Sequence, residues 1–194
     1  SFIGKKANST RPLVVQVIIS SNKKFSEEFF EYQLYIIRRK IEKRISLKKI
    51  DNFYICSLSC RSVIYKGLFL AEQLSNFYPD TQRKDFISHF ALYHQRYSTN
   101  TFPTWSLAQP FRILAHNGEI NTLKGNKNWI KAHEPMINHP NFNGNIKNLI
   151  PIIPLNSSDS ASLDSVMELL LRSGRNLPLV TKMLIPEAWS HRKD

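Results

Sequence analysis

Residues 94–128 have the sequence HQRYSTNTFPTWSLAQPFRILAHNGEINTLKGNKN, and the predicted architecture rests on this stretch. It begins inside an unbroken alternating run, residues 88–97, crosses a loop that contains two prolines, and enters a second apolar run, residues 111–115. Alternation of this kind and short apolar runs bounded by turn residues are typical of β-strands. We therefore predict two strands whose ends carry polar side chains.

Outward from this stretch, predicted strands and helices are interspersed along the chain. Further β-rich runs occupy residues 12–19, 53–59 and 62–65, the last two at hairpin spacing. Helical signals place helices over residues 27–44, 68–77, 120–133 and 160–172, with Ser26 as N-cap of the first and Gly174 just after the last. Because the chain has no regular βαβ alternation and no glycine-rich phosphate loop, we predict an α+β fold.

The composition is that of a globular chain, with 194 residues of which 42% are hydrophobic, enough to bury a core as one domain. Its apolar runs end far short of the roughly 20 residues that a membrane-spanning helix needs. Its first residues do not resemble a secretory signal. Cys56 and Cys60 are too few for a disulfide framework, and on a strand both would face one layer, so we predict two buried, unreactive thiols.

Charge is distributed unevenly along the chain. The formal net charge is +12, and residues 1–50 supply +8 of it, from 12 Lys and Arg less 4 Asp and Glu. Within the predicted helix the apolar residues at helical spacing are Leu34, Ile37, Ile41 and Ile45, and the basic residues are Arg38, Arg39, Lys40, Lys43 and Arg44. We predict that these cations form a solvated helix face. The alternative, a basic nucleic-acid-binding domain, lacks an accompanying aromatic stacking platform.

Two short motifs carry side chains suited to binding or catalysis. Arg96 lies at the end of a predicted strand, and a guanidinium grips a carboxylate with two parallel hydrogen bonds; a structural ion pair is the alternative. Asn117 and Gly118 offer a side-chain amide and a backbone N–H that together stabilise a tetrahedral oxyanion. An Asn-Gly pair between apolar runs is also the strongest short signal for a type I′ hairpin turn, so both interpretations stay open.

A third motif precedes the predicted helix 160–172. Residues 156–160 read NSSDS, and any Ser or Asp among them is suited to cap the helix. Asp159 is suited instead to hold a ligand ammonium group, and with Arg96 it would form a clamp for an amino acid. His94 and His116 have no spaced His, Cys or carboxylate companions, so we predict no metal site.

Together these motifs resemble a known family. Residues 94–128 closely resemble the glutamine amidotransferase domain of glutamate synthases of the large-subunit or ferredoxin-dependent type. The resemblance extends back to residues 53–67 (FYICSLSCRSVIYKG), forward to residues 157–175 (SSDSASLDSVMELLLRSGR) and on to residues 186–189 (PEAW). Residues 1–194 are thereby identified as part of a class II glutamine amidotransferase domain.

The resemblance implies a fold and a set of roles for individual residues. The fold is that of N-terminal-nucleophile hydrolases, an αββα four-layer sandwich, incomplete in this chain. By matching positions, Arg96 would bind the glutamine α-carboxylate and Asp159 its α-amino group. Asn117 and Gly118 would form the oxyanion hole, and Tyr97 and Thr99 would line the same pocket.

The nucleophile is where the chain departs from the family. The family uses a cysteine at the mature amino terminus, whose free α-amine serves as its base, whereas this chain starts with Ser1. Cys56 and Cys60 are internal and have no free amine to replace it. We therefore expect the chain to be an internal fragment that has no activity alone.

The resemblance also implies the activity of the parent enzyme. That enzyme would hydrolyse L-glutamine to glutamate and ammonia and use the ammonia to convert 2-oxoglutarate to glutamate, an oxidoreductase reaction of glutamate biosynthesis. FMN and an iron–sulfur cluster would lie in synthase domains of the same polypeptide, with no cofactor in this segment, and ferredoxin or a pyridine-nucleotide-linked subunit would supply electrons. The expected location is a plastid stroma or a bacterial cytoplasm, with no nucleic-acid or membrane partner. A non-catalytic amino-acid-binding module is a further alternative.

Overall fold

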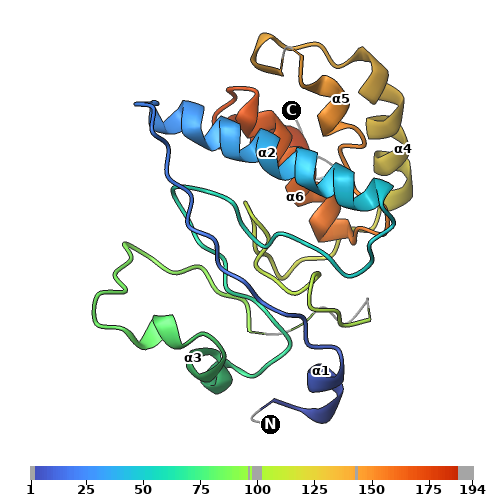
Figure 1. Cartoon of the computed structure of the whole chain (residues 1–194). Helices are drawn as coiled ribbons and strands as arrows, with labels where there is room; N and C mark the ends of the chain where they lie inside the picture. The colour runs from blue at the N-terminus through green and yellow to red at the C-terminus, as the bar shows by residue number, and fades with distance from the viewer. Residues whose placement is uncertain (1–2, 96, 98–101, 143, 188–194) are drawn as a thin grey trace. The chain divides into compact units, whose positions relative to one another are not determined.

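The computed structural model describes residues 3–95, 97, 102–142 and 144–187 (Figure 1). The chain divides into two compact units, Ser1–Gly118 and Glu119–Asp194, and each is described by itself. In the first unit the helices are α1 (Lys5–Ser9), α2 (Glu27–Leu47) and α3 (Leu74–Phe77), with 3₁₀ turns at Ala71–Gln73 and Pro79–Gln82. In the second they are α4 (Leu123–His133), α5 (Ile146–Leu149), α6 (Asp159–Arg172) and α7 (Leu177–Leu184), with 3₁₀ turns at Glu134–Met136 and Pro140–Phe142.

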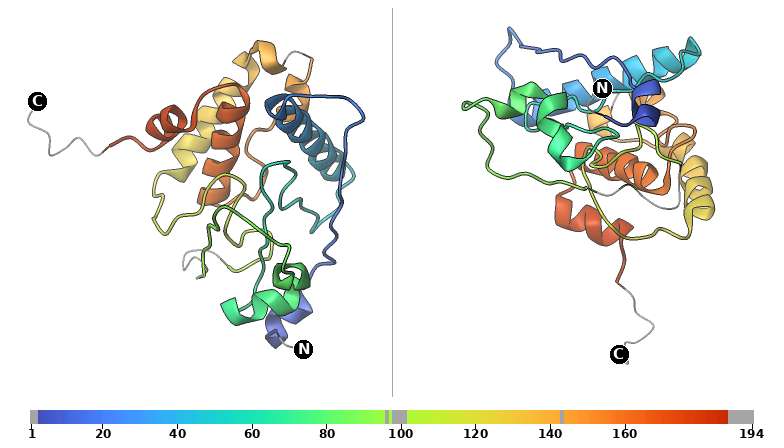
Figure 2. Two further views of the ribbon diagram at one scale, coloured as in Figure 1. Left: turned by 90° about the vertical axis from the view of Figure 1, so that its left-hand side faces the viewer. Right: turned by 90° about the horizontal axis from the view of Figure 1, so that it is seen from below.

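The two longest helices confirm the sequence prediction, and their ends show why. Ser26 caps α2 by accepting a hydrogen bond from the Phe29 N–H, and Ser158 caps α6 by accepting one from the Ala161 N–H. After α6 the chain turns at Gly174, whose φ of +94° is a left-handed conformation that favours glycine. α7 follows this turn and contacts α6 (Figure 2). The other two predicted helices form over shorter ranges, as Leu74–Phe77 and Leu123–His133.

The strand predictions are not met among the residues that the structure describes. Residues 12–19, 53–59, 62–65 and 111–115, and the described part of 88–97, contain no β-strand. The α+β class and the four-layer αββα sandwich are therefore not seen in this part of the chain. Apolar alternation favours an extended backbone, but a strand exists only when a neighbouring strand completes its hydrogen-bond ladder.

The predicted hairpin shows what replaces such a ladder. Its two arms meet where the Ile64 N–H donates to Ser57 Oγ at 3.2 Å, a link made by a side chain and not by paired backbones. At the tip, the N–H groups of Arg61 and Ser62 both donate to Ser59 Oγ. The turn that the spacing predicts is therefore present, without the regular backbone pairing that would make its arms strands.

The prediction of a solvated basic face on α2 is wrong for two of its five cations. Arg38 is 2% exposed and Arg39 is 8% exposed, whereas Ile37, expected on the apolar face, is 40% exposed. Helix geometry accounts for the burial of both arginines, because residues 31, 34, 35, 38, 39 and 42 recur at three- and four-residue spacing and share one side of the helix. That side is buried although it carries charges, since Glu42 pairs with both arginines.

An aromatic cluster forms part of the core of the first unit. It consists of Phe69, Phe77, Tyr78 and Trp105, with ring centroids 5.1 Å apart for Phe69 and Phe77 and 5.3 Å for Phe77 and Trp105. Gly67 lies against this cluster, and a Cβ at that position would come within 2.4 Å of Phe69. The indole Nε1 of Trp105 donates to the Ala7 carbonyl, which ties the cluster to α1.

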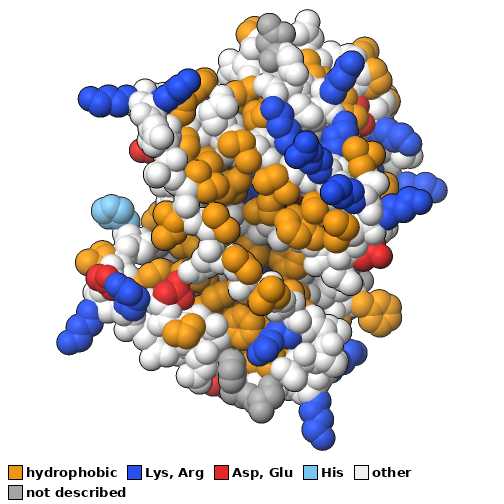
Figure 3. Space-filling model, viewed as in Figure 1, with side chains coloured by type: hydrophobic (Ala, Val, Ile, Leu, Met, Phe, Trp, Pro, Cys, Tyr) orange, Lys and Arg blue, Asp and Glu red, His pale blue; other side chains and the backbone are white. Residues whose placement is uncertain are grey.

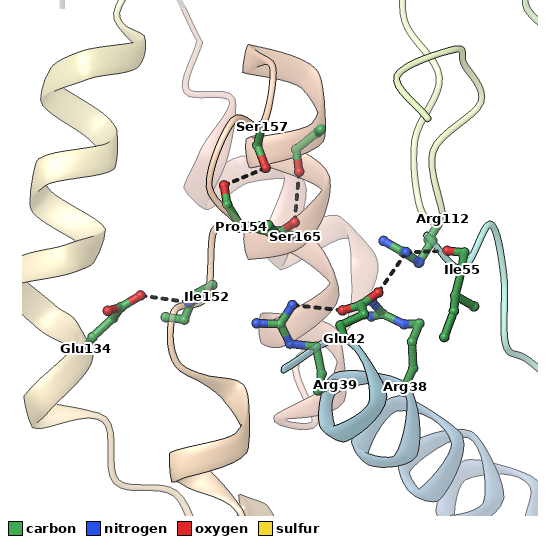
Figure 4. Close-up of polar contacts among 11 residues, drawn as sticks. Arg38, Arg39, Glu42, Ile55, Arg112, Glu134, Ile152, Pro154, Ser157 and Ser165 are labelled. Carbon is green, nitrogen blue, oxygen red and sulfur yellow. Dashed lines mark hydrogen bonds and ion pairs between the residues drawn. The ribbon is translucent and has the colours of Figure 1, made fainter. Parts of the chain in front are cut away.

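The second unit has a core of its own, made mostly of aliphatic side chains. Its most buried members are Phe142, Leu149, Ile152, Met167 and Val180. The buried Glu134 carboxylate accepts a hydrogen bond from the Ile152 N–H at 2.7 Å and so holds the chain between α5 and α6 (Figure 4).

Many large apolar side chains remain at the surface (Figure 3). In the segment between α1 and α2, Leu13 is 90% exposed and Ile18 is 98% exposed. In the described ranges no helix is both long enough and apolar enough to cross a membrane.

Candidate functional site

The segment 102–118 ends in two of the predicted site residues, Asn117 and Gly118, and several contacts fix its course. At its start, the Thr104 N–H donates to the Tyr97 hydroxyl at 3.1 Å. Trp105 follows and is anchored in the aromatic cluster. Next, the Lys66 ammonium donates to the Ser106 carbonyl at 2.7 Å and lies 5.0 Å from the centre of the Phe111 ring.

Arg112 holds the middle of the segment to α2 (Figure 4). Its Nη2 donates to the Ile55 carbonyl and, at 3.1 Å, to Glu42 Oε1. The same carboxylate accepts from Arg38 at 2.7 Å and from Arg39 at 3.1 Å. Burial acts to raise the pKa of Glu42, but the three guanidinium groups outweigh burial and hold this pKa below its usual value.

We expect Glu42→Gln to lower the free energy of unfolding by about 3 kcal/mol, because it leaves three guanidinium groups without their shared carboxylate. The folded-state pKa of Glu42 is depressed, so its contribution is present above the unfolded-state pKa and is lost as the pH falls through the folded-state pKa. Urea unfolding at pH 7 and at pH 3 measures both effects. Equal destabilisation by the substitution at the two pH values would contradict this account.

Gln109 organises the end of the segment. Its side-chain Nε2 donates to the His116 carbonyl at 3.0 Å, and its Oε1 accepts from the His116 N–H at 2.8 Å. Between these residues a turn is closed by the Phe111 N–H, which donates to the Leu114 carbonyl at 2.9 Å.

Asn117 and Gly118 are both exposed, directly after His116. Neither has a positive φ, and a type I′ turn requires positive φ at both of its central residues, so the hairpin-turn alternative is excluded. The Gly118 N–H, one of the two donors of the predicted oxyanion hole, donates to His116 Nδ1 at 3.1 Å. In the described portion of the chain no hydrogen bond engages the Asn117 side chain.

Asp159, in the second unit, is the first residue of α6 and is half-buried. Because Ser158 is the N-cap, Asp159 does not have to cap the helix. Its Oδ1 accepts from the N–H and, at 3.2 Å, from the hydroxyl of Ser160. Its Oδ2 accepts no hydrogen bond from the residues described, which leaves one carboxylate oxygen for a ligand.

The loop in front of α6 is held by α4. The Lys127 ammonium donates to the Ser157 carbonyl at 2.7 Å. The Ser157 hydroxyl donates in turn to the Pro154 carbonyl at 2.8 Å, as Figure 4 shows. Asn156, which lies between Pro154 and Ser157 in the sequence, has a φ of +61°. Lys127 therefore supports the backbone next to Asp159, a role that no periodicity or motif in the sequence indicates.

The two thiols differ from the prediction in their exposure. Cys56 is half-buried and Cys60 is exposed, so only Cys56 approaches the predicted burial. Burial raises the pKa of the Cys56 thiol, and desolvation together with the Glu31 carboxylate raises that of Cys60. Both thiols are thereby weakened as nucleophiles.

The residues present do not fit an iron–sulfur cluster, one of the two cofactors implied for the parent enzyme. Iron–sulfur clusters are held mostly by four cysteine thiolates, and the chain has two cysteines. Within the described ranges, no three His, Cys, Asp or Glu side chains come together as a set of metal ligands.

The predicted site residues are thus located only in part. Tyr97, Asn117 and Gly118 lie in the first unit and Asp159 in the second, while Arg96 and Thr99 fall outside the described residues. Gln109 was not predicted from the sequence, where its signal would have been a polar residue eight positions before Asn117.

Comparison with known proteins assigns the family. The model of class II glutamine amidotransferases matches residues 1–194. The chain is 61% identical over 187 residues to the large chain of an NADPH glutamate synthase from Azospirillum brasilense, covering 96% of this chain and 12% of that protein. It is 45% identical over 192 residues to a chloroplastic ferredoxin-dependent glutamate synthase from Spinacia oleracea, covering 98% of this chain and 12% of that protein.

A yeast relative has a third electron donor in its name, NADH, beside the NADPH and ferredoxin of the other two. The NADH glutamate synthase of Saccharomyces cerevisiae is 43% identical over 193 residues, covering 99% of this chain and 9% of that protein. The chain therefore spans about an eighth or less of the length of these relatives.

Proposed function

This chain belongs to the class II glutamine amidotransferases, and we propose that it binds glutamine within a larger glutamate synthase. The parent polypeptide would hydrolyse L-glutamine to glutamate and ammonia, and its synthase domains would use the ammonia to convert 2-oxoglutarate to a second glutamate. The observation that carries the proposal is the exposed Asn117–Gly118 pair, which is not a hairpin turn, in a chain that matches the family along its whole length.

We assign the following roles to the site residues. The Arg96 guanidinium binds the α-carboxylate of glutamine, and the Asp159 carboxylate binds its α-ammonium group. Asn117 and Gly118 donate hydrogen bonds to the oxyanion that forms when a nucleophile attacks the side-chain amide carbon. Tyr97 and Thr99 line the pocket. The open Oδ2 of Asp159 supports its assignment.

The nucleophile is proposed to come from elsewhere in the polypeptide. It attacks the amide carbon and its proton passes to the amide nitrogen, so that the C–N bond breaks and ammonia leaves. Water then hydrolyses the acyl intermediate, which releases glutamate and restores the protonated nucleophile. Cys56 and Cys60 are poor candidates, because their environments raise the pKa of both thiols.

Cofactors and partners belong to the proposal for the whole enzyme. FMN and an iron–sulfur cluster would be held by synthase domains. For the cluster, this agrees with the two cysteines of this segment, which are too few for four thiolate ligands. Ferredoxin or a pyridine-nucleotide-linked subunit would supply electrons in a plastid stroma or a bacterial cytoplasm. The nucleic-acid alternative loses support because Arg38 and Arg39 are buried.

The proposal is tested with the full-length polypeptide, its electron donor, 2-oxoglutarate and glutamine labelled with ¹⁵N in the side-chain amide. We expect the label to appear in the α-amino group of newly formed glutamate, as detected by NMR. Unlabelled ammonia in excess serves as the control for direct ammonia use. Binding of glutamine without release of its amide nitrogen would instead support the amino-acid-binding module.

A further inference from the structure

The side chain of Gln109 occupies both backbone hydrogen-bonding groups of a residue seven positions away. Its amide donates to the His116 carbonyl at 3.0 Å and accepts from the His116 N–H at 2.8 Å. This is the exchange that two residues of neighbouring strands would make, but here one partner is a side chain. The described residues have no strand to provide it.

This pair of contacts fixes the orientation of two successive peptide planes. The His116 N–H belongs to the peptide plane before that residue, and its carbonyl belongs to the plane that continues into the N–H of Asn117. Holding both planes fixes the position of the Asn117 Cα, from which the Asn117 side chain and the peptide plane of the Gly118 N–H continue. The contact between the Gly118 N–H and His116 Nδ1 depends on the same residue.

We propose that Gln109 is a positioning residue for glutamine hydrolysis, and that it holds the Asn117 and Gly118 donors in place through the backbone of His116. The inference rests on the proposed oxyanion role of those two donors. Donors act on an oxyanion only when they are oriented before the charge develops, so loosening their backbone lowers kcat more than it weakens glutamine binding.

Two substitutions in the full-length polypeptide separate this role from a merely structural one. Gln109→Met keeps the length of the side chain and removes both hydrogen bonds; we expect a roughly tenfold lower kcat with glutamine, based on the loss of two neutral hydrogen bonds. The KM for glutamine and the rate with ammonia should stay close to those of the wild type. Gln82→Met is the matched control, because Gln82 makes one amide contact, to the Ser75 carbonyl, elsewhere in the same unit.

Gln109→Glu provides a second test, in which the pH dependence of kcat is measured. A merely structural role of Gln109 would not change this pH dependence. An ionised carboxylate accepts from the His116 N–H but repels the His116 carbonyl, whereas a neutral carboxylic acid has one donor and one acceptor, as the amide does. The ratio of variant to wild-type kcat should therefore rise as the pH falls from 8 toward 5.

The outcomes distinguish the inference from the proposed function. If the wild-type polypeptide does not hydrolyse glutamine, the proposed function fails. If the wild type is active and Gln109→Met retains its full kcat, or if the Gln109→Glu ratio is independent of pH, the positioning role is overturned. A tenfold loss in kcat that also appears with ammonia would likewise overturn it, since the defect would then be general.

Discussion

Asn117→Ala should lower the glutamine-dependent kcat of the full-length enzyme by roughly 10²–10³, because it removes an oxyanion donor that acts chiefly in the transition state. Glutamine binding should change little. Asn117 is exposed, so its truncation leaves no cavity and the variant should melt at the wild-type temperature. Steady-state kinetics with glutamine, beside the rate with ammonia, measure the effect.

Asn117→Gly is the control for a role of the backbone. If Asn117 were needed for its conformation alone, Gly would restore the activity lost in Asn117→Ala. The backbone at Asn117 does not have positive φ, so glycine offers no conformational advantage there, and we expect no rescue. A near-normal kcat for Asn117→Gly would refute the assignment of Asn117 to the oxyanion hole.

Asp159→Asn should raise the KM for glutamine by roughly 10- to 150-fold, which corresponds to the loss of one charge-assisted contact of about 1.5–3 kcal/mol. The substitution keeps an oxygen that can accept from the Ser160 N–H, so the start of α6 should stay intact. At saturating glutamine, kcat should fall much less, because the charge serves binding.

A substrate analogue makes the test of Asp159 specific. Glutaramate has the same side-chain amide and carboxylate as glutamine but lacks the α-amino group. The wild type should strongly prefer glutamine, and the Asp159→Asn variant should lose most of this preference. An undiminished preference would mean that another group binds the α-amino group, whatever the change in KM.

Local sequence was sufficient for the helices whose signals lie within a few residues. The caps Ser26 and Ser158 and the stop at Gly174 act on neighbouring backbone groups, and α2 and α6 begin and end close to where these residues predict. The candidate site residues Asn117, Gly118 and Asp159 were also chosen from local sequence, by residue type and neighbours, and their roles stay predictions.

Features that need a distant partner were not predictable in this way. An extended run becomes a strand only when it pairs with another strand, so the alternating segments could not show by themselves whether they would pair. The burial of Arg38 and Arg39 depends in part on Glu42, which also receives Arg112 from 70 positions away. Nor does the sequence mark Gln109 as the partner of His116. Tertiary structure alone settled these features, because a hydrogen bond or ion pair requires two groups to meet, and local sequence describes only one of them.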